Sequence, residues 1–191
     1  MPESLALGMA LAVLFFWAVG AYNRLVRQRS AALQAFALLE VPLRQHLELL
    51  ESCLPASLAL TGQTQSGELK GELPGETTLS WYGLRDAAGQ FAASLAAARA
   101  QPLHPGLLAA LAAAQGVLAM AWQRLQHERA HDLAGAALPA TVQARLAQLG
   151  EQTRLAADSF NQAVVGYNGA INQFPAVLLA WLFGFKPAGP L

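Results

Sequence analysis

The chain begins with an uncharged apolar run from Leu5 to Tyr22. At 1.5 Å per residue, a helix of that length spans about 27 Å, close to the roughly 30 Å hydrocarbon thickness of a bilayer. Trp17 and Tyr22 stand near the end of the run, where amphipathic aromatic rings favour the level of the lipid headgroups. The pattern therefore predicts a transmembrane anchor over residues 1–23.

Basic residues follow the apolar run directly at Arg24, Arg27 and Arg29, whereas only the amino terminus and Glu3 precede it. Because Lys and Arg accumulate on the cytoplasmic side of membrane proteins, we expect a single-pass topology with the short N-terminus outside and the rest in the cytoplasm. A cleaved signal peptide is the alternative, since residues 18–20 are small enough for cleavage. The basic segment that normally precedes the apolar run of a signal peptide is missing.

Beyond the anchor, apolar residues recur at steps of three and four, which is typical of amphipathic helices. The first such stretch continues from the anchor to about Leu54. Pro42 predicts a kink in it, and Glu40 falls in its apolar seam, where a buried partner such as an arginine would satisfy it. Residues 61–78 are rich in Gly and polar side chains, which predicts a flexible loop.

Three further helices are predicted, from about Leu79, from Pro105 and from about Ala140 to Phe174. The apolar stretch over residues 107–122 is mostly alanine and short for a second span, so we assign it to the bundle. No segment alternates convincingly with period two. The predicted fold is all-α, with an N-terminal transmembrane helix continuing into an antiparallel bundle of long helices over residues 24–175.

The last long helix has the clearest pattern, with two apolar series that each repeat every seven residues. One series shrinks to alanine where the other becomes aromatic, as facing layers of a tightly filled core do. The two series are Val142, Leu149, Ala156, Ala163, Ala170 and Leu146, Thr153, Phe160, Tyr167, Phe174.

An apolar tail over residues 176–191 follows the bundle, and its ten apolar residues are too few to cross a bilayer. The tail can lie in the membrane interface beside the anchor or pack on the end of the bundle, and both alternatives stay open. The residues expected at the membrane are Trp17, Trp181, Phe183 and Phe185.

Aromatic-asparagine pairs recur one heptad apart in the last long helix. Asparagine is a poor helix former, so its repeated use calls for a reason. Hydrogen bonds to another helix would fix the register of the bundle, and a polar docking face for a membrane partner is the functional alternative. An antiparallel bundle brings this region to the end of the anchor, so the candidate interaction residues are Tyr22, Asn23, Phe160, Asn161, Tyr167, Asn168, Phe174 and Pro175.

Composition narrows the function classes. The 191 residues are 54% hydrophobic and 13% charged with zero net charge, which fits one core plus an anchor. The scattered basic residues provide no stripe for nucleic acid, so we expect no nucleic-acid partner. Cys53 is the single cysteine and cannot form an intrachain disulfide, so we interpret it as a core residue.

One motif resembles catalytic chemistry: residues 127–131 read H-E-R-A-H on a predicted helix. His127 and His131 would share a helix face and could hold Zn²⁺, with Glu128 activating a bound water and Glu151 as a third ligand. Arg129, however, places a positive charge between the ligands. In an antiparallel hairpin Glu151 would also face residues well before His127. We therefore interpret the histidines as solvated and expect no metal, no cofactor and no catalytic residue.

Two blocks of the sequence resemble the LemA family of bacterial membrane proteins. The first runs from Tyr22-Asn23 to Leu43-Arg44, and the second from Phe160-Asn161 to the Gly-Phe-Lys-Pro segment at residues 184–187. The resemblance implies a bundle of long helices anchored in the bacterial inner membrane, without an established biochemical activity.

The predicted function is a non-enzymatic, membrane-anchored helical scaffold or adaptor. Its expected partners are the lipid bilayer and either another protein or a second copy of the chain, with no small-molecule substrate. The alternatives are a zinc-dependent membrane hydrolase that uses the motif at residues 127–131, and a self-associating protein that shapes membranes.

Overall fold

The computed structural model describes residues 2–54, 76–131, 140–174 and 176–191, with side chains for all of these except residues 2–6, 10, 76–78 and 128–131. Within these ranges every regular element is a helix, which confirms the all-α prediction. The helices are α1 (Pro2–Ser52), α3 (Glu76–Ala100), α4 (Pro105–His131), α5 (Ala140–Asn172) and α6 (Ala176–Phe183). The loop predicted at residues 61–78 lies mostly outside the described residues, and α3 begins at Glu76, slightly before the predicted start.

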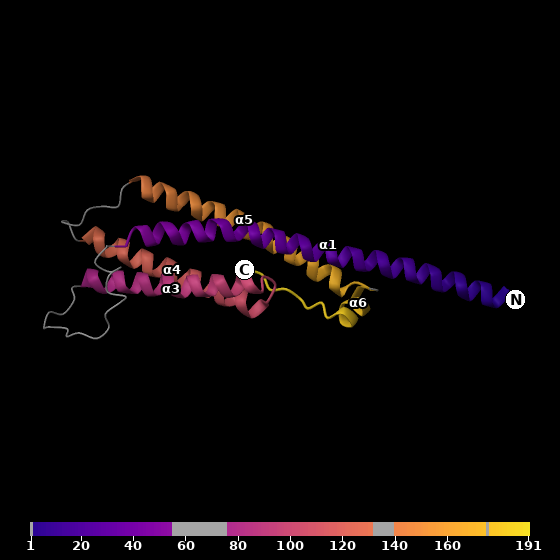
Figure 1. The fold of residues 1–191 in the computed structure, drawn as a ribbon. Helices are drawn as coiled ribbons and strands as arrows, with labels where there is room; N and C mark the ends of the chain where they lie inside the picture. Colours follow the sequence, from indigo (N-terminus) through magenta and orange to yellow (C-terminus); the bar gives the residue numbers. More distant parts are fainter. Residues whose placement is uncertain (1, 55–75, 132–139, 175) are drawn as a thin grey trace.

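α1 is one helix of 51 residues, about 76 Å long by its rise per residue. Its first part projects beyond the other helices (Figure 1), and its described side chains up to Arg24 are almost all exposed. From Leu25 onward one side of the helix is buried, which makes α1 both a long apolar N-terminal helix and a core element. α1 continues unbroken through residue 23, the predicted end of the anchor, and through Pro42.

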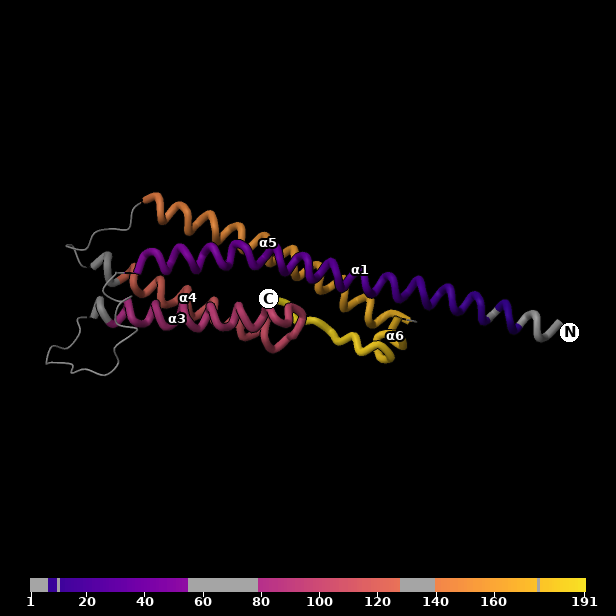
Figure 2. The backbone as a smooth tube through the Cα atoms, in the orientation of Figure 1, coloured from indigo at the N-terminus to yellow at the C-terminus, as the bar shows by residue number. Residues whose placement is uncertain are grey.

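α1 and α5 are antiparallel neighbours, as the sequence predicts (Figure 2). Their contacts run in opposite directions along the two helices. Trp17 meets Phe174 and Phe36 meets Phe160, with ring centroids 5.5 Å and 5.7 Å apart. The C-terminal end of α5 therefore lies beside the apolar N-terminal part of α1.

The buried face of α5 follows the predicted heptads at first and then leaves them. Leu146, Leu149, Thr153, Phe160, Tyr167 and Ala170 are buried as expected. Val164 and Ile171 are buried outside the two predicted series, and Phe174, which is 73% exposed, lies beyond Asn172, where α5 ends two residues earlier than predicted. A straight helix drifts about 20° per heptad against a seven-residue repeat, so the buried stripe moves onto neighbouring positions.

α3 and α4 form a second antiparallel hairpin through a tight turn at residues 101–104. His104 caps the start of α4, because its Nδ1 accepts a hydrogen bond of 3.4 Å from the Leu107 N–H. Pro105 occupies the first helical position, where a missing N–H costs nothing.

The second hairpin contacts the first mainly through α3 and α1. Glu40 on α1 is only 17% exposed, and Arg99 near the end of α3 places its Nε 3.5 Å from the Glu40 carboxylate. The arginine partner predicted for Glu40 is therefore present, and it joins the two hairpins.

Among the described residues, two helices are long and apolar enough to cross a membrane: Leu7–Ser52 and Pro105–His127. The second belongs to α4, which packs along α3, and α3 in turn contacts α1. Both helices lie away from the projecting N-terminus of α1 (Figure 1).

Candidate functional site beside the apolar part of α1

The last eight residues form a strap that runs back from α6 along α5, beside the α3–α4 turn (Figure 1). We use the term strap for residues 184–191. Gly184 makes the reversal possible, because its φ of 68° is a conformation that residues with a Cβ rarely adopt. The Phe185 N–H then bonds to the Ala180 carbonyl at 2.9 Å, which closes α6 with a Schellman-type turn.

Two asparagines of α5 hold the strap by its backbone. The side-chain amide of Asn168 donates to the Ala188 carbonyl at 2.8 Å and accepts from the Ala188 N–H at 2.9 Å. Asn161 does the same with Leu191, at 3.0 Å and 2.8 Å. We call these two residues the asparagine clasp.

The heptad spacing of the clasp has a geometric reason. Seven helical residues rise about 10.5 Å, and three residues of extended chain span about 9 to 10 Å. Asparagines seven apart on α5 can therefore meet residues three apart on an extended strap. A side-chain amide carries both a donor and an acceptor, so each asparagine satisfies one full peptide residue.

Tyr167 directly precedes Asn168 in α5 and is fully buried. Its hydroxyl donates to the Lys186 carbonyl at 3.0 Å. Burial raises the pKa of the Tyr167 phenol, while the nearby charge of Arg29 opposes that rise. The phenol therefore remains a neutral donor at physiological pH.

Aromatic side chains join the strap and α6 to the end of the apolar part of α1. The Tyr22 ring lies 5.1 Å from the Phe183 ring and 6.3 Å from the Phe185 ring, measured between centroids. The Arg29 guanidinium lies 5.8 Å from the Phe185 centroid, within cation–π range. Phe185 thus contacts both an aromatic and a cationic side chain of α1.

The strap also touches the second hairpin. Gly189 is buried, and a Cβ placed on it would lie 2.7 Å from the Pro105 Cα and 2.9 Å from the Pro105 Cβ. Such distances are shorter than van der Waals contact, so only glycine fits here. The strap is therefore wedged between α5 and the start of α4.

Comparison with protein families gives a match to the LemA family over residues 85–190, more than half of the chain. The chain belongs to the LemA family. No curated protein and no solved structure gives a match. The family match covers the clasp, α6 and nearly all of the strap, whereas the first block of the resemblance, in α1, lies outside the matched range.

The structure distributes the eight candidate interaction residues of this LemA-family chain over three environments. Phe160 and Tyr167 are buried, and Asn161 and Asn168 are half-buried and bonded to the strap. Tyr22, Asn23 and Phe174 are exposed at the surface. Pro175 lies outside the described residues.

The four residues expected at the membrane also divide. Trp17, Trp181 and Phe183 are exposed by 45%, 84% and 57%, and all three lie at the apolar end of the molecule. Phe185 is half-buried against the protein core. The strap therefore packs on the bundle, whereas α6 exposes its rings, and contact of α6 with the membrane stays a prediction.

The histidine motif gives no assembled site within the described side chains. His127 is exposed near the end of α4, while the side chains of Glu128, Arg129 and His131 lie outside the described ones. No group of three or more His, Cys, Asp or Glu suited to a metal ion occurs among the described residues.

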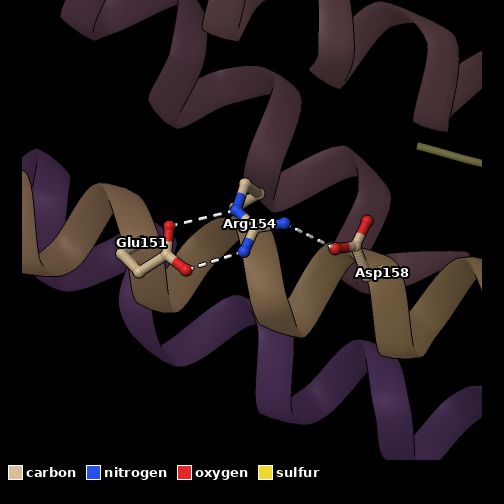
Figure 3. A network of polar contacts seen from close by, with 3 residues as sticks. All are labelled: Glu151, Arg154 and Asp158. Atoms are coloured by element: carbon tan, nitrogen blue, oxygen red, sulfur yellow. Dashed lines mark hydrogen bonds and ion pairs between the residues drawn. The ribbon is translucent and has the colours of Figure 1, made fainter.

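Glu151, the proposed third ligand, belongs to an exposed network on α5 (Figure 3). Arg154 donates to both oxygens of Glu151, at 2.7 Å and 3.0 Å, and to Asp158 at 3.0 Å. These hydrogen bonds lower the pKa of the Glu151 carboxyl below its ordinary value. A metal ion would have to displace Arg154 from this carboxylate.

Sequence reasoning missed Gly189 and the role of Arg29, which contribute only through contacts between distant segments. Arg29 appeared only as one of several basic residues after the anchor. The Gly-Phe-Lys-Pro segment was an available signal, because a glycine directly after an apolar helix is typical of a helix end followed by a reversal.

Proposed function

We propose that this LemA-family chain is a non-enzymatic scaffold, anchored by the N-terminal part of α1, that binds another protein through the exposed apolar face of α4. The proposal depends on membrane anchoring and on an unpartnered protein surface. The surface carries the argument for a partner.

α4 supports the proposal because it is apolar and the other described parts of the chain leave much of it exposed. Only 22% of the 18 residues in its most apolar stretch are buried. Five exposed positions on this surface are small or flexible and apolar: Ala109, Ala112, Ala113, Gly116 and Met120. These positions share one side of α4 by their helical spacing, and exposed apolar surface of this kind typically marks a protein–protein or membrane interaction site.

Membrane anchoring is supported by the exposed apolar part of α1. Only 6% of the 18 residues in its apolar stretch are buried. A signal sequence is also long and apolar, but here the helix continues into the core, and Trp17 and Tyr22 contact α6 and its flanks. Arg24, Arg27 and Arg29 follow the apolar part, so the proposed topology has the bundle in the cytoplasm of a bacterial cell.

Site-specific photo-crosslinking tests the partner surface. A crosslinker replaces Met120 on α4 in one variant and Gln152, an exposed residue of α5, in the control. The proposal expects a discrete adduct from position 120 in native membranes and none from position 152. An adduct of twice the chain mass would identify a second copy as the occupant. Equal adducts from both positions would refute the α4 surface.

A zinc hydrolase is the second candidate function, based on the H-E-R-A-H segment. Zinc per chain, measured in the wild type and in His131→Ala after removal of any affinity tag, separates it from the scaffold. About one zinc per wild-type chain and none in the variant would support the hydrolase and refute the proposal of a non-enzymatic scaffold.

A membrane-shaping protein is the third candidate, and it would act through self-association and the exposed rings of α6. It predicts oligomers whose size rises with concentration in detergent. Trp181→Ser with Phe183→Ser should then weaken the lipid contact of the tail.

A further inference from the structure

An open cavity of about 750 Å³ lies where four parts of the chain meet. It is lined by α1 between Tyr22 and Leu33, by the turn between α3 and α4, by the end of α6 with the beginning of the strap, and by Tyr167 of α5. The proposed scaffold activity makes no use of this cavity.

The lining of the cavity is cationic. Arg29 and Lys186 both line it, and among the described lining residues there is no Asp or Glu. Neither basic side chain forms an ion pair with any carboxylate of the described residues. The C-terminus of α3 and the N-terminus of α4 both border the cavity, so their opposed helix dipoles largely offset each other. The Arg29 and Lys186 side chains therefore make the electrostatic potential of the cavity positive.

The lining also has an order along the molecule. Tyr22 and Phe183 border the cavity at the end that faces the apolar part of α1. Arg29 lies seven residues further along α1, and helical side chains lean toward the helix N-terminus, here toward Tyr22. The Phe185 ring contacts both Tyr22 and the Arg29 guanidinium. The positive charge of Arg29 therefore lies near the aromatic end of the cavity.

An apolar aromatic end beside two cations that form no ion pair among the described residues resembles the chemistry of the headgroup region of a bilayer. Aromatic rings favour the boundary between acyl chains and headgroups, and basic residues just beyond it attract anionic lipids. The volume of the cavity also exceeds what a single inorganic phosphate would fill. The structure therefore favours a lipid over a small soluble anion.

We propose that this cavity binds the headgroup of an anionic phospholipid, with the phosphate between Arg29 and Lys186 and the glycerol end against Tyr22 and Phe183. The proposal rests on the membrane anchoring in the proposed function and is independent of the α4 partner. A bound headgroup would bridge α1 and the strap at the bilayer surface.

Native mass spectrometry of the full chain in detergent tests the site, with phosphatidylglycerol and phosphatidylcholine of identical acyl chains as probes. Arg29→Gln and Lys186→Gln remove one charge each. Each should weaken phosphatidylglycerol binding roughly fivefold, and the double variant roughly thirtyfold, as expected when one or both direct contacts with the phosphate are lost. Phosphatidylcholine binding should not change.

Two controls separate the site from general attraction. Arg27→Gln removes a neighbouring exposed charge of α1 that does not line the cavity, and it should change binding less than twofold. Arg29→Lys retains the charge and should retain most of the binding, whereas a merely structural role of the guanidinium would not be rescued.

Several results would overturn the proposal: equal losses in Arg27→Gln and Arg29→Gln, no preference for phosphatidylglycerol in the wild type, or competition by glycerol 3-phosphate at the affinity of the lipid. Vesicle flotation distinguishes this failure from failure of the anchor. A chain that floats equally with both lipids lacks only the headgroup site, whereas a chain that floats with neither lacks the anchor as well.

Discussion

Removing one member of the asparagine clasp should release part of the strap. In Asn168→Ala, the Ala188 N–H and carbonyl lose their partners, at 2.9 Å and 2.8 Å, in a residue that is 6% exposed. A hydrogen bond contributes about 1 kcal/mol net, so the two together stabilise the closed strap by about 2 kcal/mol. That free energy corresponds to a roughly thirtyfold change in the equilibrium between closed and open strap.

Hydrogen exchange of the strap amides is the appropriate measurement, because alanine is also the better helix former and would mask part of the effect in global unfolding. The Ala188 amide should exchange roughly thirtyfold faster in Asn168→Ala. Asn172→Ala is the matched control, since Asn172 is exposed at the end of α5 and its side chain forms none of the described hydrogen bonds. Equal exchange of the Ala188 amide in both variants and in the wild type would refute the clasp.

Three further substitutions test other parts of the account. Gly189→Ala should detach the strap from α4, because the new Cβ would lie 2.7 Å from the Pro105 backbone. The control is Gly150→Ala, where the new Cβ meets nothing within 4 Å. The tail should be proteolysed faster in Gly189→Ala than in the control, and equal rates would contradict the prediction. Thr153→Val should raise the free energy of unfolding by about 1 kcal/mol, since Thr153 Oγ1 is buried without a hydrogen bond among the described residues; a lower denaturation midpoint would contradict this. Burial lowers the pKa of His46 from 6.5, so the unfolded chain binds the proton more readily and stability should fall as the pH drops below about 6.5. Unfolding midpoints in His46→Gln should lose this dependence, and an unchanged pH profile in the variant would exclude His46 as its source.

Much of the fold was predictable because a helix requires a local spacing of apolar residues that can be recognised in the sequence. The apolar run before Arg24, the seam of α1 and the two heptad series of α5 together predicted long antiparallel helices, and Glu40 in an apolar seam predicted an arginine partner. Periodicity failed at the end of α5, because helical drift moves the buried stripe onto Ile171 and because the helix ends at Asn172, before the exposed Phe174.

The site was predictable only in part. The spacing of Asn161 and Asn168 was noticed, but their partner is an extended segment about 20 to 30 residues away that has no periodic signature. Hydrogen bonds to the backbone also require no particular residue type, because Ala188 and Leu191 contribute only main-chain atoms. The sequence therefore does not reveal these two partners. The steric requirement at Gly189 depends on the position of α4 and becomes visible only in three dimensions.

The depth of single labelled positions in lipid vesicles tests the central claim, a chain held in the membrane by α1 with α6 at the surface. Fluorophores are attached in a Cys53→Ser background at Leu14 on α1, Trp181 on α6 and Met120 on α4, all of which are exposed. Quenchers on the lipid acyl chains should quench position 14 most, position 181 partly and position 120 not at all. Quenching at position 120 as strong as at position 14, or none at positions 14 and 181, would contradict the account.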